Sequence, residues 1–143
     1  MTVKPEFVDY VRTMVLGDLA ANDRIEAALD EQGWEGFPRY MSALFFVAID
    51  RRFRPGTPKA EIIRFVADLR ADVSEGGPPI DAAAAESMIE SVLDPSVDYD
   101  APQQMIGTIQ AATVYKVLAD NALSDAELDE FLAEAARLAS RTS

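Results

Sequence analysis

The sequence predicts an all-α fold, a compact single-domain bundle of about six to seven helices. Apolar residues recur at spacings of three and four along the chain, and no segment alternates apolar and polar residues for more than a few positions. Proline, glycine and capping residues divide this pattern into seven helical segments. The chain of 143 residues has the length of one typical domain, so residues 1–143 are expected to share one core. A subdomain break is possible near 75–80, where two glycines and two prolines follow each other.

The first three predicted helices cover about 5–16, 23–32 and 38–53. Pro5 suits the first position of a helix. Asp23 and Glu26 have the spacing of a capping box, and Gly33 accepts the backbone conformation that ends a helix. The third segment is apolar on nearly every side, which predicts a central buried helix. Its apolar residues are Tyr40, Met41, Leu44, Phe45, Phe46, Val47, Ile49 and Phe53.

The remaining predicted helices cover about 58–74, 81–93, 101–121 and a last segment from 124 onward. Thr57 is expected to cap the first of these, with Pro58 as its first helical residue. Asp100 with Gln103 has capping spacing at the start of segment 101–121. Ser124 with Glu127 forms a Ser-x-x-Glu box at the start of the last segment. An acidic loop, residues 94–100, separates segment 81–93 from segment 101–121.

The composition excludes several kinds of chemistry. The chain has no cysteine and no histidine, so disulfides, thiolate nucleophiles, histidine-based catalysis and Cys or His metal ligands are ruled out. None of its seven glycines fits a phosphate-binding loop motif. The longest strongly apolar stretch, residues 43–49, is too short to cross a bilayer, and the start of the chain does not resemble a signal peptide. We therefore expect a cytoplasmic protein without a cofactor and without membrane contact.

Charge is distributed unevenly along the chain. The net charge is −12, and residues 81–143 hold 12 acidic and 3 basic residues, a net charge of −9. By contrast, residues 39–70 hold seven basic and three acidic residues, a net charge of +4. Five of these basic residues, here named the basic corner, surround the break between two predicted helices: Arg51, Arg52, Arg54, Lys59 and Arg64.

The basic corner has three possible roles. Arg51 and Arg52 suit the C-terminal end of a helix dipole, and the corner is expected to meet the chain's own acidic half or a neighbouring subunit. An acidic partner protein is the second possibility. Nucleic acid is the third, since the start of the next helix would add to the attraction of the side chains, although the net charge of −12 opposes non-specific binding to a polyanion.

Acidic residues outside this region do not form a recognisable site. The loop with Asp94, Asp98 and Asp100 lacks the glycine and terminal glutamate of a calcium-binding EF-hand. In the segment that ends at Glu127, Lys116 and Leu118 occupy the positions of the first two calcium ligands, which excludes a complete EF-hand. Acidic residues 125–130 offer carboxylates for acid–base chemistry, but a solvated helix face explains them better.

Three aromatic residues are candidates for an interface. Trp34 lies between two predicted helices, where it either anchors a partner or covers the core beneath it. Phe45 and Phe46 lie in the helix that is apolar on nearly every side, and a second subunit would cover its surplus apolar face.

The sequence therefore favours a non-catalytic protein-interaction or regulatory module that recognises helix faces and forms homo-oligomers. The alternative is a helix-turn-helix-like nucleic-acid binder that uses the basic corner at 51–64, and a carboxylate-dependent enzyme is the third hypothesis.

Overall fold

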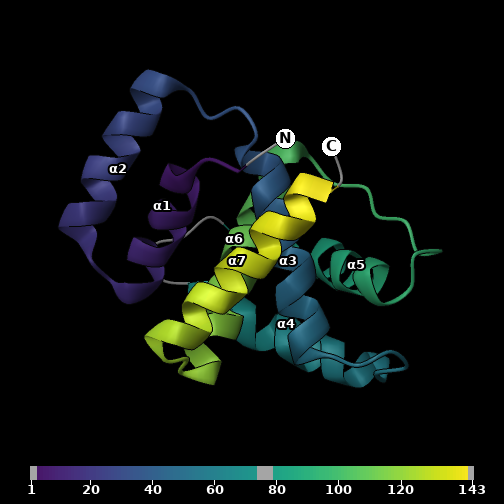
Figure 1. Cartoon of the computed structure of the whole chain (residues 1–143). Helices are drawn as coiled ribbons and strands as arrows, with labels where there is room; N and C mark the ends of the chain where they lie inside the picture. The colour runs from purple at the N-terminus through teal and green to yellow at the C-terminus, as the bar shows by residue number, and fades with distance from the viewer. Residues whose placement is uncertain (1–2, 74–78, 142–143) are drawn as a thin grey trace. The chain divides into compact units, whose positions relative to one another are not determined.

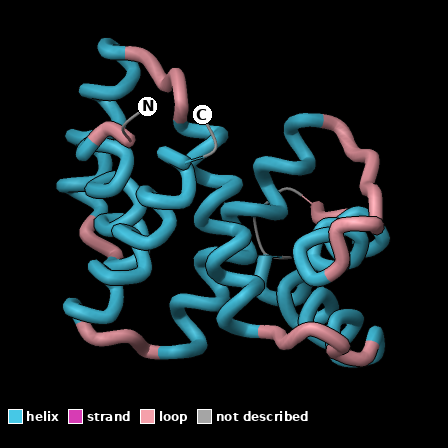
Figure 2. The backbone as a smooth tube through the Cα atoms, turned by 45° about the vertical axis from the view of Figure 1, so that its right-hand side comes forward, coloured by secondary structure: helices cyan, strands magenta, loops and turns pink. Residues whose placement is uncertain are grey.

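The computed structural model describes residues 3–73 and 79–141, and within these ranges it is all-α (Figures 1 and 2). The described residues form seven helices and no strand, which confirms the predicted fold class. The helices are α1 (Pro5–Leu16), α2 (Leu19–Gln32), α3 (Phe37–Arg52), α4 (Lys59–Val73), α5 (Ala82–Leu93), α6 (Gln103–Asn121) and α7 (Asp125–Arg141). Within the described ranges, none of them combines the length and apolar character needed to span a membrane.

The chain divides into two compact units, which are described separately. Unit 1 comprises residues 1–47 and 118–143, and unit 2 comprises residues 48–117. Helices α3 and α6 each contribute residues to both units. The break predicted near 75–80 falls mainly on residues 74–78, which lie outside the described part of the chain.

In unit 1, α1 packs against α2 and α7. Gly17 ends α1 in the left-handed conformation at φ 74°, and Asp18 begins α2 by accepting a hydrogen bond from the Ala21 N–H at 3.2 Å. The core of this unit is formed by fully or almost fully buried side chains: Phe7, Val11, Leu29, Tyr40, Leu44, Phe131 and Leu132.

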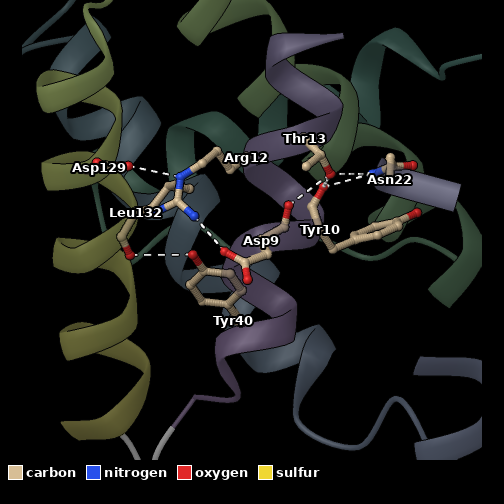
Figure 3. A network of polar contacts seen from close by, with 8 residues as sticks. All are labelled: Asp9, Tyr10, Arg12, Thr13, Asn22, Tyr40, Asp129 and Leu132. Carbon is tan, nitrogen blue, oxygen red and sulfur yellow. Dashed lines mark hydrogen bonds and ion pairs between the residues drawn. The ribbon is translucent and has the colours of Figure 1, made fainter. Parts of the chain in front are cut away.

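Polar contacts join the helices of unit 1 (Figure 3). Arg12 of α1 donates to Asp129 of α7 at 2.9 Å and to Asp9 of its own helix at 2.6 Å. On α2, the Asn22 amide donates to the Tyr10 carbonyl at 2.9 Å and to Thr13 Oγ1 at 3.1 Å. These contacts fix α1 between its two neighbours by side chains as well as by apolar packing.

In unit 2, α4 packs against α5. Arg70 Nε on α4 donates to the Ile80 carbonyl at 2.9 Å, and Lys116 of α6 lies 3.5 Å from Asp72 of α4. The core contains buried apolar residues from the helices of the unit and from the segments beside them, among them Ile49, Phe53, Ile62, Phe65, Leu69, Ile80, Met88, Ile89, Ile109 and Val114.

Three predicted helix starts are wrong. Helix α2 begins at Leu19, with Asp18 rather than Asp23 as its cap, because α1 ends at Gly17 and leaves a very short turn. Helix α6 begins at Gln103, since Pro102 disfavours the helical conformation at Ala101 and makes a cap at Asp100 too early. Helix α4 begins at Lys59, because the Thr57 side chain closes the preceding turn instead of capping the helix.

The capping box at the start of α7 is confirmed. The Ser124 N–H donates to Glu127 Oε1 at 3.0 Å, and the Glu127 N–H donates to Ser124 Oγ at 3.2 Å. Both partners lie within four residues of each other, so this contact needs no help from the rest of the fold.

Candidate functional site

The basic corner lies in unit 2, where α3 ends and α4 begins. A tight turn joins the two helices, with Pro55 and Gly56 at its centre and Gly56 at φ 83°. This combination is typical of a type II turn, whose third position requires positive φ. The Arg54 N–H donates to Thr57 Oγ1 at 3.0 Å, and the Thr57 N–H donates to the Arg54 carbonyl at 3.0 Å. Hydrogen bonds within the turn therefore satisfy these backbone polar groups.

Arg52 is held against aromatic rings. Its guanidinium carbon lies 4.8 Å from the centre of the Phe53 ring and 5.5 Å from the centre of the Phe65 ring. The two rings meet edge to face at 5.3 Å, and both are buried. A cation above an aromatic face is attracted by the ring quadrupole. Arg52 therefore covers the core of unit 2 and keeps its charge at the surface.

Lys116 also contacts this aromatic pair and was not among the predicted site residues. Its Nζ lies 5.6 Å from the centre of the Phe65 ring, and its side chain is 12% exposed. Lys116 is separated from the basic corner by more than fifty residues in sequence, and no motif connects the two. Only the fold brings Lys116 to the ring that Arg52 also contacts.

Lys59 forms an ion pair inside unit 2. Its Nζ lies 2.7 Å from Glu90 Oε1 of α5. The hydrogen bond to Glu90, followed by the charge of the same carboxylate, raises the pKa of Lys59. Lys59 therefore meets the acidic C-terminal half of its own chain, as the first interpretation of the basic corner expects for this residue.

The other arginines of the corner point outward. Arg51, Arg54 and Arg64 are exposed. Within the described part of the chain, no ion pair or hydrogen bond engages the guanidinium groups of Arg54 and Arg64. Of the five predicted cations, Arg52 thus contacts aromatic rings and Lys59 pairs with Glu90, whereas the guanidinium groups of Arg54 and Arg64 have no partner among the described residues.

Two hollows flank the turn. One has a volume of about 340 Å³ and is lined by Arg52, Arg54 and Glu61 together with the turn residues 55–58. The carboxylate of Glu61 offsets part of the positive charge there. The other has a volume of about 300 Å³ and combines the ion pair of Lys59 and Glu90 with Asp94 and the apolar residues Ile62, Leu93 and Val97.

The second hollow is relevant to the hypothesis of a carboxylate-dependent enzyme, because two carboxylates line it. Glu90 is paired with Lys59. Asp94 Oδ1 accepts hydrogen bonds from Ser96 Oγ at 2.7 Å and from the Ser96 N–H at 3.0 Å, and these lower the pKa of Asp94. A general acid at neutral pH needs a raised carboxyl pKa, so the shift of Asp94 has the opposite direction. Both carboxylates are engaged in structural contacts.

Helix α4 carries a second, outward face that no sequence pattern indicated. Residues three, four and seven apart share one side of a helix. The exposed residues on this side of α4 are Ala60, Ile63, Arg64, Ala67 and Ala71. Ile63 is 47% exposed, although large aliphatic side chains are usually buried. We call these five residues the outer face of α4.

Helix α2 of unit 1 has an outward face of opposite charge. Its exposed residues at helical spacing are Leu19, Asp23, Glu26, Ala27 and Asp30, here named the outer face of α2. Leu19 is 70% exposed. Asp30 accepts a hydrogen bond from the Trp34 indole at 2.8 Å, whereas Asp23 and Glu26 have no partner among the described residues. This face therefore combines exposed carboxylates with one exposed leucine.

The predicted interface aromatics lie in different environments. Trp34 is half-buried in an aromatic cluster, with its ring centre 5.2 Å from those of Tyr10 and Phe37 and 6.4 Å from that of Phe7. This arrangement favours the interpretation that Trp34 covers the core. Phe45 is only 5% exposed and belongs to the core, while Phe46 is 44% exposed. An interface on this side of α3 would thus depend on Phe46.

Comparisons with family models, curated proteins and solved structures find no match to this chain. Within the described residues, no three acidic side chains gather as possible ligands of a metal ion.

Proposed function

We propose that this chain is a non-catalytic protein-interaction module that self-associates, with the outer face of α4 in one copy docked on the outer face of α2 in a second copy. The observation that carries the proposal is the exposure of Ile63 at 47% beside the outward guanidinium of Arg64. Arginine is enriched at protein interfaces, and burial of an exposed aliphatic side chain supplies binding free energy. The proposed compartment is the cytoplasm.

Small side chains next to Ile63 suit a helix as the partner. Ala60, Ala67 and Ala71 lie on the same side of α4 and extend little from the backbone. The distance between two packed helices depends on the side chains at their contact and is about 8–10 Å. Alanines at the contact favour the shorter distances, where Ile63 reaches the partner backbone.

Charge complementarity supports a second copy as the occupant. The outer face of α2 presents Asp23, Glu26 and Asp30, and the outer face of α4 presents Arg64, its one charged residue, with the exposed Arg54 before the start of the helix. Each face also carries one exposed aliphatic residue, Leu19 on α2 and Ile63 on α4. Opposite charges around an apolar centre fix the register of an interface and disfavour other partners.

Salt should weaken this association. Each copy has a net charge of −12, so two copies repel each other over long distances, and this repulsion is largely screened at 0.15 M salt. Raising the salt from 0.15 to 1 M shortens the screening length from about 8 to about 3 Å, which weakens the close arginine–carboxylate pairs. We expect the fraction of associated chains to fall over this range.

Light scattering after size-exclusion chromatography tests the proposal. The wild-type mass should rise above the chain mass of 15.6 kDa as the concentration increases through the micromolar range. Ile63→Asp should remain monomeric with an unchanged helical circular dichroism spectrum. Phe46→Asp is the matched control, since it removes another exposed large apolar residue outside the two proposed faces, and it should associate like the wild type. A monomeric wild type, or an Ile63→Asp variant that associates normally, contradicts the proposal.

Nucleic-acid binding is the competing function, and the outward Arg54 and Arg64 favour it. Glu61 and Asp68 oppose it, because both are exposed on the helix that would enter a groove. Fluorescence anisotropy with labelled duplex and single-stranded DNA at low salt separates the two functions. We expect no binding. Binding that decreases steeply with salt and is abolished by replacing Arg51, Arg52 and Arg54 with alanine would support nucleic acid instead.

A further inference from the structure

The lining of a hollow in unit 1 shares no residue with either proposed interaction face. The hollow has a volume of about 230 Å³. Its lining residues come from the start of α1 and the residues before it, the end of α2, the segment between α2 and α3, the first turn of α3, and the end of α7. Pockets for drug-sized ligands have volumes of about 300–1,000 Å³, so this hollow suits a smaller molecule. All of its lining residues belong to one unit.

The floor of the hollow is apolar. Phe7 is 2% exposed and Ala139 is 3% exposed, and both line the hollow. Gly36 lies beside them at φ 91°, where a side chain would be strained, and a Cβ on Gly36 would lie 3.7 Å from Phe7 Cε2. Because Gly36 has no side chain, no Cβ at this position covers the edge of the Phe7 ring that lines the hollow.

The rim carries more positive than negative charge. Lys4, Arg39 and Glu35 line it, a net charge of +1, whereas unit 1 as a whole has 14 acidic and 6 basic residues, a net charge of −8. The Lys4 ammonium is held in place: it donates to the Gly33 carbonyl at 3.4 Å and lies 5.6 Å from the centre of the Phe7 ring.

Arg39 is the group at this rim that is available to a ligand. It is exposed and has no partner among the described residues. It lies in the first turn of α3, where the helix dipole also favours an anion. The planar guanidinium binds a carboxylate through two parallel hydrogen bonds, which a compact ammonium cannot do.

We propose that this hollow binds a small carboxylate with an apolar body, its carboxylate paired with Arg39 and Lys4 and its apolar body against Phe7. A neutral molecule of the same shape leaves both cations without an anion. An amine of the same shape is repelled by them. The distribution of charge above an apolar floor thus defines the chemical class of the ligand.

Trp34 provides a direct signal for binding at this floor. It is the only tryptophan of the chain, and its ring stacks on Phe7 at a centre-to-centre distance of 6.4 Å. Titration of the intact protein with 3-phenylpropionate should change the fluorescence of Trp34 in a saturable way. 3-Phenylpropionamide, which has the same shape without the charge, should bind at least about tenfold more weakly, a difference of about 1.4 kcal/mol.

Arg39→Gln should weaken the binding of 3-phenylpropionate by about tenfold or more and leave the melting temperature unchanged. Arg24→Gln, which removes an exposed arginine of α2 in the same unit, should leave the affinity within about twofold. Equal affinity for the carboxylate and the amide, no effect of Arg39→Gln, or no saturable change up to millimolar concentration would overturn the proposal. Ile63→Asp should bind the carboxylate normally, so this site and self-association can fail independently.

Discussion

Tyr40 is a polar residue in the core of unit 1. Its side chain is completely buried, and its hydroxyl donates to the Leu132 carbonyl of α7 at 3.4 Å (Figure 3). Burial raises the pKa of the Tyr40 phenol well above its ordinary value of 10.0, and the nearby Arg12 offsets only part of this effect. The folded protein therefore keeps the phenol protonated at a pH where the unfolded chain releases the proton.

Tyr40 consequently makes stability depend on alkaline pH. The contribution of the raised Tyr40 pKa to the free energy of unfolding is fully present below pH 10. It is lost as the pH rises above 10, by up to about 1.4 kcal/mol per pH unit. Tyr40→Phe removes this dependence and costs about 0.5–1.5 kcal/mol at pH 8 through the lost hydrogen bond. Urea unfolding of both proteins at pH 8, 10 and 11 measures the difference. Parallel pH profiles would show that Tyr40 ionises without unfolding.

At the scale of the helices, a capping signal was reliable where no other group close in sequence competed for the capping side chain. The box of Ser124 and Glu127 is complete within four residues and is confirmed. Thr57 failed as a cap because its hydroxyl meets Arg54 in the turn before the helix. The outer faces of α2 and α4 were not predicted, since helical periodicity identifies the buried stripe but cannot tell which exposed residues form a second surface.

The two candidate caps provide a matched pair of substitutions. Ser124→Ala should reduce the free energy of unfolding by about 1 kcal/mol, because it leaves the Glu127 N–H without its side-chain partner. Asp23→Ala should change stability by no more than about 0.5 kcal/mol, since Asp23 is an exposed residue inside α2 and caps nothing. Thermal or urea unfolding measures both. A larger loss for Asp23→Ala would show that the helix begins there in solution.

For the whole molecule, the sequence predicted the fold class but not the composition of the units. Unit 1 combines residues 1–47 with residues 118–143, and no pattern in either segment indicates that the two ends of the chain share a core. The basic corner could be predicted because four of its five cations lie within nine residues. The contacts of Arg52 and Lys59 depend on Phe65 and Glu90, which only the fold brings to them.

The pairing of the outer faces of α4 and α2 between copies is the central claim, and charge exchange tests it most directly. One variant carries Arg54→Glu and Arg64→Glu, and the other carries Asp23→Lys and Glu26→Lys. Each variant alone should be monomeric in sedimentation velocity, because its two faces then have like charge. An equimolar mixture should form complexes of at least twice the chain mass of 15.6 kDa, since each variant meets an opposite charge on the other. A mixture that remains monomeric, or single variants that associate like the wild type, would contradict the claim.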